Sequence, residues 1–506
     1  MSPIAYQIVT MVLYLVAMLL VGWYSYRRTR DLNDYMLGGR DLPPAVAALS
    51  AGAADMSGWL LMGLPGAIYA SGLVESWIAV GLTVGAWANW RFVAPRLRAY
   101  SEVANDSITV PSFFENRLHD RSRALRIASG LVILVFFTFY VSSGMTASGV
   151  FYESSFGQDY HEGLLVISTV TVAYTLFGGF LAVSYTDFIQ GVMMFAALIA
   201  VPLIGVFAVG GVGEVSAAVH AIDPNHLSMV KGATAVGVIS ALAWGLGYFG
   251  QPHIIVRFMA LRNAQEAVAG RRIGIGWMIL SVSGAICTAL VGLAYFHQHP
   301  ELAIQDPETV YIRMGQILFH PIIAGFMLAA VLAAIMSTMS SQLLVTSSAL
   351  VEDLYRVFNV EKDDKHYVLM GRLAVLVVAL IAGYFAWERN ETILGLVSFA
   401  WAGFGAAFGP TVLLSLYWRR LTWQGALTAM IAGAVTVGLW GPSTSWGGTR
   451  EDPLFGLYEM VPGFVIGLVL AVVVSLMTYR RQEGLEAEFD EMRRTSKAMV
   501  AAEKEV

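Results

Sequence analysis

The chain has 506 residues, of which 57% are hydrophobic and only 13% are charged. Soluble domains have roughly 25% charged residues, so this composition excludes an ordinary soluble globular protein. The single cysteine, Cys287, excludes a disulfide framework and a cysteine-based metal site. The net charge of −5 says little about partners, and nothing in the sequence supports nucleic-acid binding.

Thirteen apolar stretches are long enough to cross about 30 Å of hydrocarbon as helices. Continuous runs of this length are typical of membrane helices, whereas the strands of membrane barrels alternate in hydrophobicity. The sequence therefore predicts an all-α integral membrane protein with about 13 transmembrane helices. In chain order the stretches are residues 4–25, 44–70, 74–94, 125–152, 162–180, 188–210, 233–257, 273–296, 317–350, 368–387, 393–417, 424–440 and 457–479.

The basic residues predict how these helices are oriented. All but four of the 31 Lys and Arg residues lie on one side of the membrane if the C-terminus is cytoplasmic. The connection 91–126 is rich in arginine, whereas the loop 152–162 has acidic residues and no basic one. Because cytoplasmic loops are enriched in basic residues, we expect a multi-pass protein of the bacterial inner membrane with a periplasmic N-terminus and a cytoplasmic C-terminus.

The second stretch carries an acid in an apolar span, within ALSAGAADMSGWLLMGLPG at residues 48–66. Small residues precede Asp55, and Ser57, Gly58 and Trp59 follow it, which weakens helix propensity. An ionisable side chain at this depth costs about 2.5–3.5 kcal/mol and marks a functional site by default. We interpret the segment as a helix that breaks at mid-membrane, with a purely structural buried acid as the alternative.

The seventh stretch has a second interruption, in SALAWGLGYFGQPHIIVRF at residues 240–258. Glycines alternate with aromatic residues before Pro252, a pattern that favours either a broken helix or a kinked packing helix. The two segments cross the membrane in opposite directions. This relationship predicts two inverted units of five helices, at residues 44–210 and 211–418.

The remaining segments flank these units. Residues 1–43 are expected to form the first transmembrane helix and a cytoplasmic loop, and residues 419–480 the last two spans. The segment 481–506 is charged throughout, which predicts a solvated cytoplasmic tail.

The ninth stretch contains a polar stripe, in AAIMSTMSSQLLVTSSAL at residues 333–350. Ala334, Ser337, Thr338 and Ser341 follow the spacing of one helix face, with Ser340 beside them. Hydroxyl and carbonyl oxygens suit a hard cation, although Ser and Thr in membrane helices often serve only packing. The stripe is therefore a candidate cation site.

With these segments the sequence resembles the sodium:solute symporter family over nearly its whole length. The stretches that carry the resemblance are YMLGGRDLPPAVAALSAGAADMSGWLLMGLPGAIYASGLVESW, AYTLFGGFLAVSYTD, AWGLGYFGQPHIIVRFMA, AAIMSTMSSQLLV with SALVEDLY, and SFAWAGFGAAFGP. The resemblance implies an inverted five-plus-five repeat of the leucine-transporter type. It also implies symport of L-proline with sodium, and no enzymatic activity.

The resemblance further implies specific sites. The main sodium site would use the carbonyls of Ala53, Met56 and Ala334 with the hydroxyls of Ser337 and Thr338. The substrate pocket would contain Ser57, Gly58, Trp59, Tyr140, Trp244 and Tyr248. Coupling roles would fall to Asp55 and Arg40, and an external gate would include Glu75. A second sodium site would use Asp187, Ser340 and Ser341, although Asp187 is equally suited to capping a helix.

The leading hypothesis is thus sodium-coupled import of L-proline by alternating access, with sodium as the co-transported ion and membrane lipid as the surrounding partner. Symport of another small organic solute remains open, because one fold serves many functions. A membrane solute sensor is a further alternative. The sequence contains no appended signalling domain and no nucleotide-binding P-loop, so transport energy is expected from an ion gradient.

Overall fold

The computed structural model describes the chain except for residues 1, 27–36, 357–362, 390–391, 441–455 and 503–506. The described residues are overwhelmingly helical, and the one β-bridge joins Leu42 and Leu261. The α-helices are α1 (Pro3–Tyr26), α3 (Pro44–Gly58), α4 (Leu64–Ser71), α5 (Ser76–Ala88), α6 (Ala94–Val103), α7 (Val110–Arg117), α8 (Ala124–Phe156), α9 (Tyr160–Val209), α10 (Val212–Ile222), α11 (Ala235–Gly247), α12 (Pro252–Met259), α13 (Glu266–Gln298), α14 (Val310–Leu318), α15 (Pro321–Ser348), α17 (Asp364–Ala386), α18 (Ile393–Tyr417), α19 (Trp423–Trp440), α20 (Met460–Thr478) and α21 (Glu483–Ala502).

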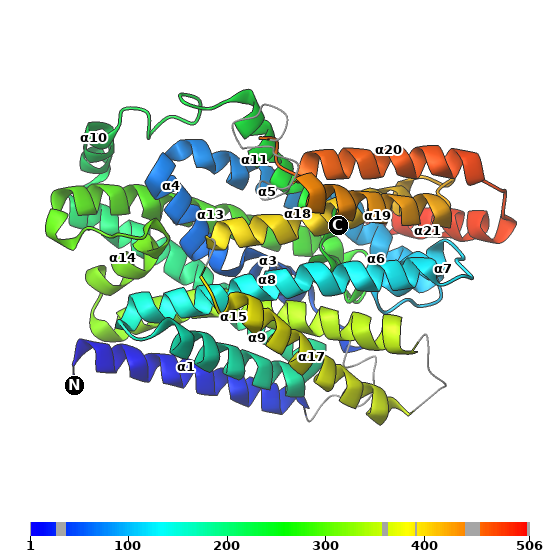
Figure 1. The fold of residues 1–506 in the computed structure, drawn as a ribbon, viewed down its shortest axis with the longest axis horizontal. Coiled ribbons are helices and arrows are strands. Elements are labelled where there is room, and N and C mark those ends of the chain that lie inside the picture. Colours follow the sequence, from blue (N-terminus) through cyan, green and yellow to red (C-terminus); the bar gives the residue numbers. More distant parts are fainter. Residues whose placement is uncertain (1, 27–36, 357–362, 390–391, 441–455, 503–506) are drawn as a thin grey trace.

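The long helices lie side by side along one common direction, horizontal in Figure 1. In the described part of the chain, ten are long and apolar enough to cross a membrane. Their outer surfaces are apolar: Phe207 on α9 is 73% exposed and Leu380 on α17 is 74% exposed. Such exposure is costly in water and favourable in hydrocarbon, which confirms the prediction of a helical membrane protein.

Three of the thirteen predicted spans are absent from these ten helices. Residues 74–94 are divided between α5 and a following π-helical turn, η4 (Asn89–Val93). Residues 162–180 are the first part of α9, which runs on through a non-helical Gly179. Residues 233–257 are split between α11 and α12. The count of thirteen membrane crossings therefore stays a prediction.

Both predicted interruptions exist as breaks in the helices. In the first, Ser57 has φ 40° and ψ −167°, after which the chain continues as the π-helical turn η2 (Trp59–Gly63). A positive φ is uncommon for a residue with a Cβ, so the surrounding structure must hold Ser57 in this conformation. In the second, the 3₁₀ turn η5 (Tyr248–Gly250) and an extended Gln251 separate α11 from α12, which restarts at Pro252.

The interior of the bundle is built around α15. This helix packs against α1, α3, α8 and α9, and α3 packs also against α13. The middle of α15 is fully enclosed, because Ala333, Ala334 and Ser337 have no exposed surface. The polar stripe of the ninth predicted span therefore faces protein and not lipid.

A second close contact joins α5 to α11. A Cβ placed on Gly85 would lie 2.2 Å from the carbonyl oxygen of Gly245, and one on Gly81 would lie 2.5 Å from that of Leu242. The two backbones therefore touch directly, which only glycine permits.

Candidate functional site

The break in α3 lies against the polar stripe of α15. Ser337 Oγ donates a hydrogen bond to the Ala53 carbonyl oxygen over 2.8 Å, and Thr338 Oγ1 lies 3.4 Å from the same atom. Both hydroxyls also lie within 3.2 Å of the Ala334 carbonyl oxygen. Four of the five predicted sodium ligands are thus gathered in one small, buried cluster of oxygens.

Met56 is the fifth predicted ligand. Its carbonyl oxygen accepts a hydrogen bond from the Trp59 N–H across the break. Since a carbonyl oxygen has two lone pairs, this bond leaves one acceptor position at Met56. The break at Ser57 therefore places carbonyl oxygens beside α15 that a continuous helix would have used internally.

Asp55 connects this cluster with the broken helix α11–α12. The Tyr248 hydroxyl donates a hydrogen bond to Asp55 Oδ2, and Asp55 Oδ1 is buried without a partner among the described residues. The backbone of Tyr248 is held in place by Asn89, whose Nδ2 donates a hydrogen bond to the Tyr248 carbonyl oxygen over 2.9 Å. The carboxylate of Asp55 thus joins the two breaks, and one of its two oxygens has no hydrogen-bond donor among the described residues of the protein interior.

Aromatic rings form a wall next to these two breaks. The ring centroids of Trp59 and Trp244 are 6.3 Å apart, and Trp244 stacks on Trp401 with an interplanar angle of 25°. Trp401 Nε1 donates to the Trp244 carbonyl oxygen over 2.8 Å, and Tyr458 stacks on the Trp244 ring at 5.5 Å. Trp401 and Tyr458 were missed by the sequence reasoning, although Trp401 lies in the quoted segment SFAWAGFG.

The other predicted pocket residues lie close to this wall. Tyr140 on α8 lies toward Ser57, but its hydroxyl is buried and makes no hydrogen bond of good geometry among the described residues. Gly58 packs closely, since a Cβ there would lie 3.2 Å from that of Ala147. All six predicted pocket residues come from the two breaks and α8, and the side chains among them are at most 6% exposed. These side chains are therefore enclosed by protein.

Asp187 on α9 lies in a separate polar cluster. Its Oδ2 accepts hydrogen bonds from Ser50 Oγ at 2.8 Å and Ser341 Oγ at 3.2 Å. The same oxygen is 3.1 Å from Nη2 of Arg257, and neither charged side chain has exposed surface. Ser340 donates instead to the Ser337 carbonyl oxygen. Asp187 and Ser341 are therefore brought together as expected, while Ser340 is turned to its own helix.

Arg257 was not singled out by the sequence reasoning. It lies on α12, and besides Asp187 it donates to Ser341 Oγ over 2.6 Å and to Ser50 Oγ over 3.1 Å. Its guanidinium thus stands where a cation bound by Asp187 and Ser341 would be placed. The signal that would have found it is an arginine within a predicted apolar span, which must pair with an acid in the interior.

Two further predicted residues lie near the ends of the bundle. Arg40, in the short turn η1 (Gly38–Arg40), donates to the Met259 carbonyl oxygen and to Ser101 Oγ, each over 2.9 Å. Arg40 is therefore tied to other parts of the fold and is not a basic residue that contacts only the membrane surface. Glu75 ends the turn η3 (Leu73–Glu75) between α4 and α5, where it is half-buried and its carboxylate makes no hydrogen bond or ion pair among the described residues.

Comparison with known proteins places these features in a family. The model of the sodium:solute symporter family matches residues 35–433. The chain belongs to the sodium:solute symporter family. Relatives include the high-affinity proline transporter PutP of Bacillus subtilis, 58% identical over 94% of this chain and 99% of that protein. The osmoregulated proline transporter OpuE of the same organism is 54% identical over 94% of this chain and 95% of that protein. The sodium/proline symporter of Staphylococcus aureus is 48% identical over 95% of this chain and 94% of that protein.

Two solved structures share the fold of this chain. A Na⁺-coupled sialic acid symporter in a substrate-bound outward-open state superimposes with a TM-score of 0.81 at 19% identity, covering 94% of this chain and 98% of that one. Mhp1, a nucleobase-cation-symport-1 transporter, superimposes with a TM-score of 0.53 at 14% identity, covering 90% and 98%. The fold is thus the inverted-repeat fold of the leucine-transporter type, and the protein is a membrane transporter and not an enzyme.

Proposed function

We propose that the protein imports L-proline into a bacterial cell together with sodium, by alternating access. The observation that carries this proposal is the meeting of both helix breaks at Asp55, between the oxygen cluster of α15 and a wall of aromatic rings. Membership of the sodium:solute symporter family supports the coupling ion. Relatives at 48–58% identity that are named for proline support the solute.

Sodium binding is the first step of this mechanism. The ion would be held by the carbonyls of Ala53, Met56 and Ala334 and the hydroxyls of Ser337 and Thr338, all hard oxygen ligands. Because these groups belong to α3 and α15, the ion would hold the two helices at a fixed spacing. The negative charge of Asp55, which directly precedes Met56 and follows Ala53 by two residues, would favour entry of the cation.

Proline binding would follow on the other side of the break. Its carboxylate is suited to the backbone N–H groups around Ser57, Gly58 and Trp59, where a helix begins again, provided that the Trp59 N–H is released from the Met56 carbonyl or shared with it. Its secondary ammonium is suited to the Tyr140 and Tyr248 hydroxyls and to the faces of Trp59 and Trp244. The apolar ring would pack on the same aromatic wall. Sodium that orders the break would thus also prepare the proline pocket.

The energy source is the sodium gradient. One sodium ion that moves down 100 mV supplies about 2.3 kcal/mol before any concentration difference is counted. The proposed second site, at Asp187, Ser340 and Ser341, would raise this amount, but it requires Arg257 to leave the space beside Asp187 and Ser341, and Ser340 to turn away from the Ser337 carbonyl. If it carries a co-transported ion, flux should reverse at a ratio of two sodium ions per proline, and Ser341→Ala should lower that ratio to one. A reversal potential that fits one ion in the unaltered protein would remove the second site.

The decisive experiment is proline uptake into proteoliposomes with and without an imposed sodium gradient. We expect concentrative uptake only with the gradient, and competition by excess proline but not by other amino acids, pantothenate or sugars. If a different solute is taken up under the same gradient, the protein is still a sodium symporter, but its solute is not proline. Binding of proline without any uptake would instead support a sensor.

The proposed location is the bacterial inner membrane with the N-terminus periplasmic. In a Cys287→Ser background, Ser2→Cys should react with an impermeant thiol reagent from the periplasm, and Ala502→Cys should not. The opposite pattern would show that the number of crossings or their direction is wrong.

A further inference from the structure

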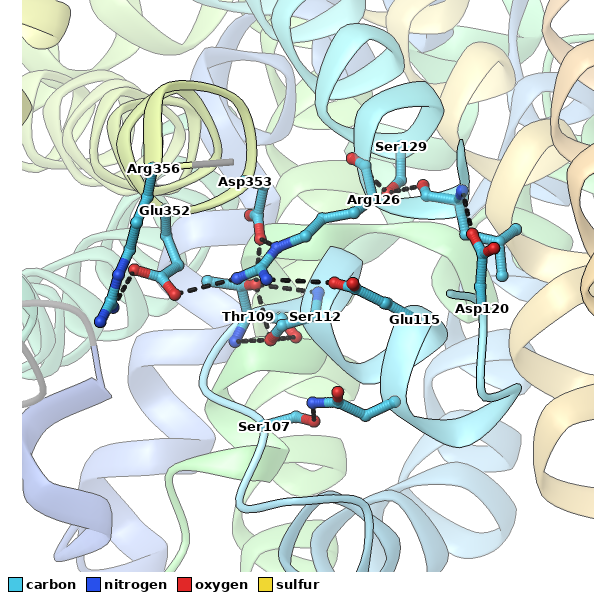
Figure 2. Close-up of polar contacts among 12 residues, drawn as sticks. Ser107, Thr109, Ser112, Glu115, Asp120, Arg126, Ser129, Glu352, Asp353 and Arg356 are labelled. Atoms are coloured by element: carbon cyan, nitrogen blue, oxygen red, sulfur yellow. Dashed lines mark hydrogen bonds and ion pairs between the residues drawn. The ribbon is translucent and has the colours of Figure 1, made fainter. Parts of the chain in front are cut away.

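Arg126, at the start of α8, is the centre of a network of three carboxylates and one further arginine (Figure 2). Its Nε lies 2.9 Å from Asp353 Oδ1, its Nη1 3.1 Å from Glu115 and its Nη2 2.9 Å from Glu352. Arg356 pairs with the other oxygen of Glu352 over 2.9 Å. One guanidinium thus bridges α7, α8 and the π-helical turn η8 (Ala349–Tyr355), which continues α15.

The network also holds the short loop between α6 and α7. The Thr109 hydroxyl donates to Asp353 Oδ1 over 2.9 Å, beside the bond from Arg126. Thr109 is the N-cap of α7, where it forms a capping box with Ser112. The end of the loop is therefore fixed to α15 and α8, and Asp353, which has no exposed surface, is the link between them.

The start of the same loop is fixed to different helices. Arg40 lies 2.9 Å from Asp106, donates to the Ser107 carbonyl oxygen over 2.7 Å, and contacts the Met259 carbonyl at the end of α12. Arg40 precedes α3 by only a few residues. The loop at residues 104–109 therefore joins two sets of helices: α3, α6 and α12 on one side, and α8 and α15 on the other.

Residues of this loop line two cavities, named here the outer cavity, lined by residues 105–108, and the inner cavity, lined by Ile108 and Thr109. The outer one, of about 440 Å³, is lined by Asp106, Arg126, Glu352 and Arg356. The inner one is a small space lined by Phe180, Pro252, Ser348 and the pair Thr109–Asp353. Ile108 lines both. The Thr109–Asp353–Arg126 contacts therefore form the partition between the outer cavity and the α12 segment that begins directly after the break at Tyr248–Gln251.

We propose that Arg126 closes the cytoplasmic exit of the transport path by holding Asp353 and Thr109 together, and that its ion pairs must open before solute is released. This inference rests on the proposed transport function and adds a gating role to it. The side of the bundle follows from the predicted topology, because α7 and the C-terminal helix α21 lie toward the same end in Figure 1.

The charge balance explains why Arg126 is the residue on which closure depends. It faces three carboxylates, those of Glu115, Glu352 and Asp353, whereas Arg356 contacts only Glu352. Without Arg126, these acids on α7 and η8 would repel one another, and the buried Asp353 would lose the only positively charged partner that it has among the described residues. The second oxygen of Asp353 already lacks a hydrogen bond among the described residues. Closure is therefore stable only while the guanidinium is in place.

The test measures access to Ser348, which lines the inner cavity and is 7% exposed. Ser348→Cys in a Cys287→Ser background is labelled with an impermeant thiol reagent in inside-out vesicles. Adding Arg126→Gln should speed labelling by roughly tenfold, and Arg126→Lys should give an intermediate rate, because one ion pair is retained. Arg419→Gln, which breaks a different cytoplasmic ion pair with Asp490, should leave the rate unchanged.

A second variant tests the same closure in case Arg126→Gln does not fold. Thr109→Val removes the hydroxyl that bonds Asp353 and caps α7, keeps every ion pair of Arg126, and should speed labelling by roughly threefold, whereas Thr109→Ser, which keeps the hydroxyl, should not. Equal labelling rates in the parent, Arg126→Gln and Thr109→Val would overturn the proposal. A faster rate in Arg419→Gln as well would also overturn it, because loosening would then be general. Labelling requires no transported solute, so this result is independent of whether the solute is proline.

Discussion

Arg257 on α12 and Asp187 on α9 form an ion pair of 3.1 Å in which neither side chain has exposed surface. Removing one partner leaves an uncompensated charge in the interior, at a cost of about 3–5 kcal/mol. Arg257→Gln and Asp187→Asn should each lower the unfolding temperature of the purified protein, while the double variant should recover much of the loss. Thermal unfolding in detergent measures this, and additive losses in the double variant would argue against a coupled pair.

Asp55 is expected to be essential for sodium-driven transport. Asp55→Asn keeps a group that can accept the Tyr248 hydrogen bond but removes the negative charge beside the proposed cation ligands. Proline uptake should fall by at least two orders of magnitude, equivalent to about 2.7 kcal/mol or more, while the protein still inserts. Uptake and membrane content are measured together in vesicles. Sodium-driven transport at the original rate would exclude Asp55 from coupling.

Tyr248 and Trp244 should respond differently to substitution. Trp244 contacts other rings and no group of the oxygen cluster, so Trp244→Ala should raise the apparent proline constant and leave the sodium constant nearly unchanged. Tyr248→Phe removes the hydrogen bond to Asp55 and should raise both constants. Each change is expected to be roughly tenfold, the effect of about 1.4 kcal/mol. Sodium activation curves at several proline concentrations separate the two, and identical behaviour would place both residues in the same role.

Glu75 should make stability depend on pH. Burial raises the pKa of this carboxyl above its ordinary value of 4.5. The folded protein thus keeps the proton to a higher pH than the unfolded chain does. The contribution of Glu75 to stability is complete below the ordinary value and is lost as the pH rises through the raised pKa.

Glu75→Gln tests this, because the amide resembles the protonated acid. The variant should be more stable than the unaltered protein at neutral pH, and the difference should disappear as the pH falls toward about 4. Unfolding temperatures across this range measure the effect, and the same change at the exposed Glu162 of α9 controls for loss of one surface charge. A constant difference at every pH would show that the carboxyl titrates alike in both states.

The sequence predicted those features that depend only on residues close together in the chain. The small residues around Asp55 and the glycines before Pro252 indicated both breaks, and the spacing of Ser337 and Thr338 indicated one polar face, because helix propensity and periodicity are local. The resemblance to a family then predicted that Ala53 and Ser337 meet, a contact between residues far apart in the chain.

Other contacts could not be predicted, because nothing in a single sequence says which helices face one another. Arg257 stood as an arginine in an apolar span, but its pairing with Asp187 depends on how α12 packs against α9. Trp401 lay in a recognised segment, yet its stacking on Trp244 depends on the position of α18. The bond from Tyr248 to Asp55 likewise joins two breaks whose relative depth the sequence leaves open.

The glycine contact between α5 and α11 has a consequence for how the molecule changes shape. Where Gly85 meets Gly245 there are no side chains whose rotamers could adjust, so the two helices cannot roll on one another without a clash of backbones. They must therefore travel as a single rigid body. Any bending of this broken helix is then confined to η5 and Gln251, just beyond Gly247, where the backbone leaves the helical conformation. The structure thus separates a rigid contact, between α5 and α11, from a break in the helical backbone, at η5 and Gln251.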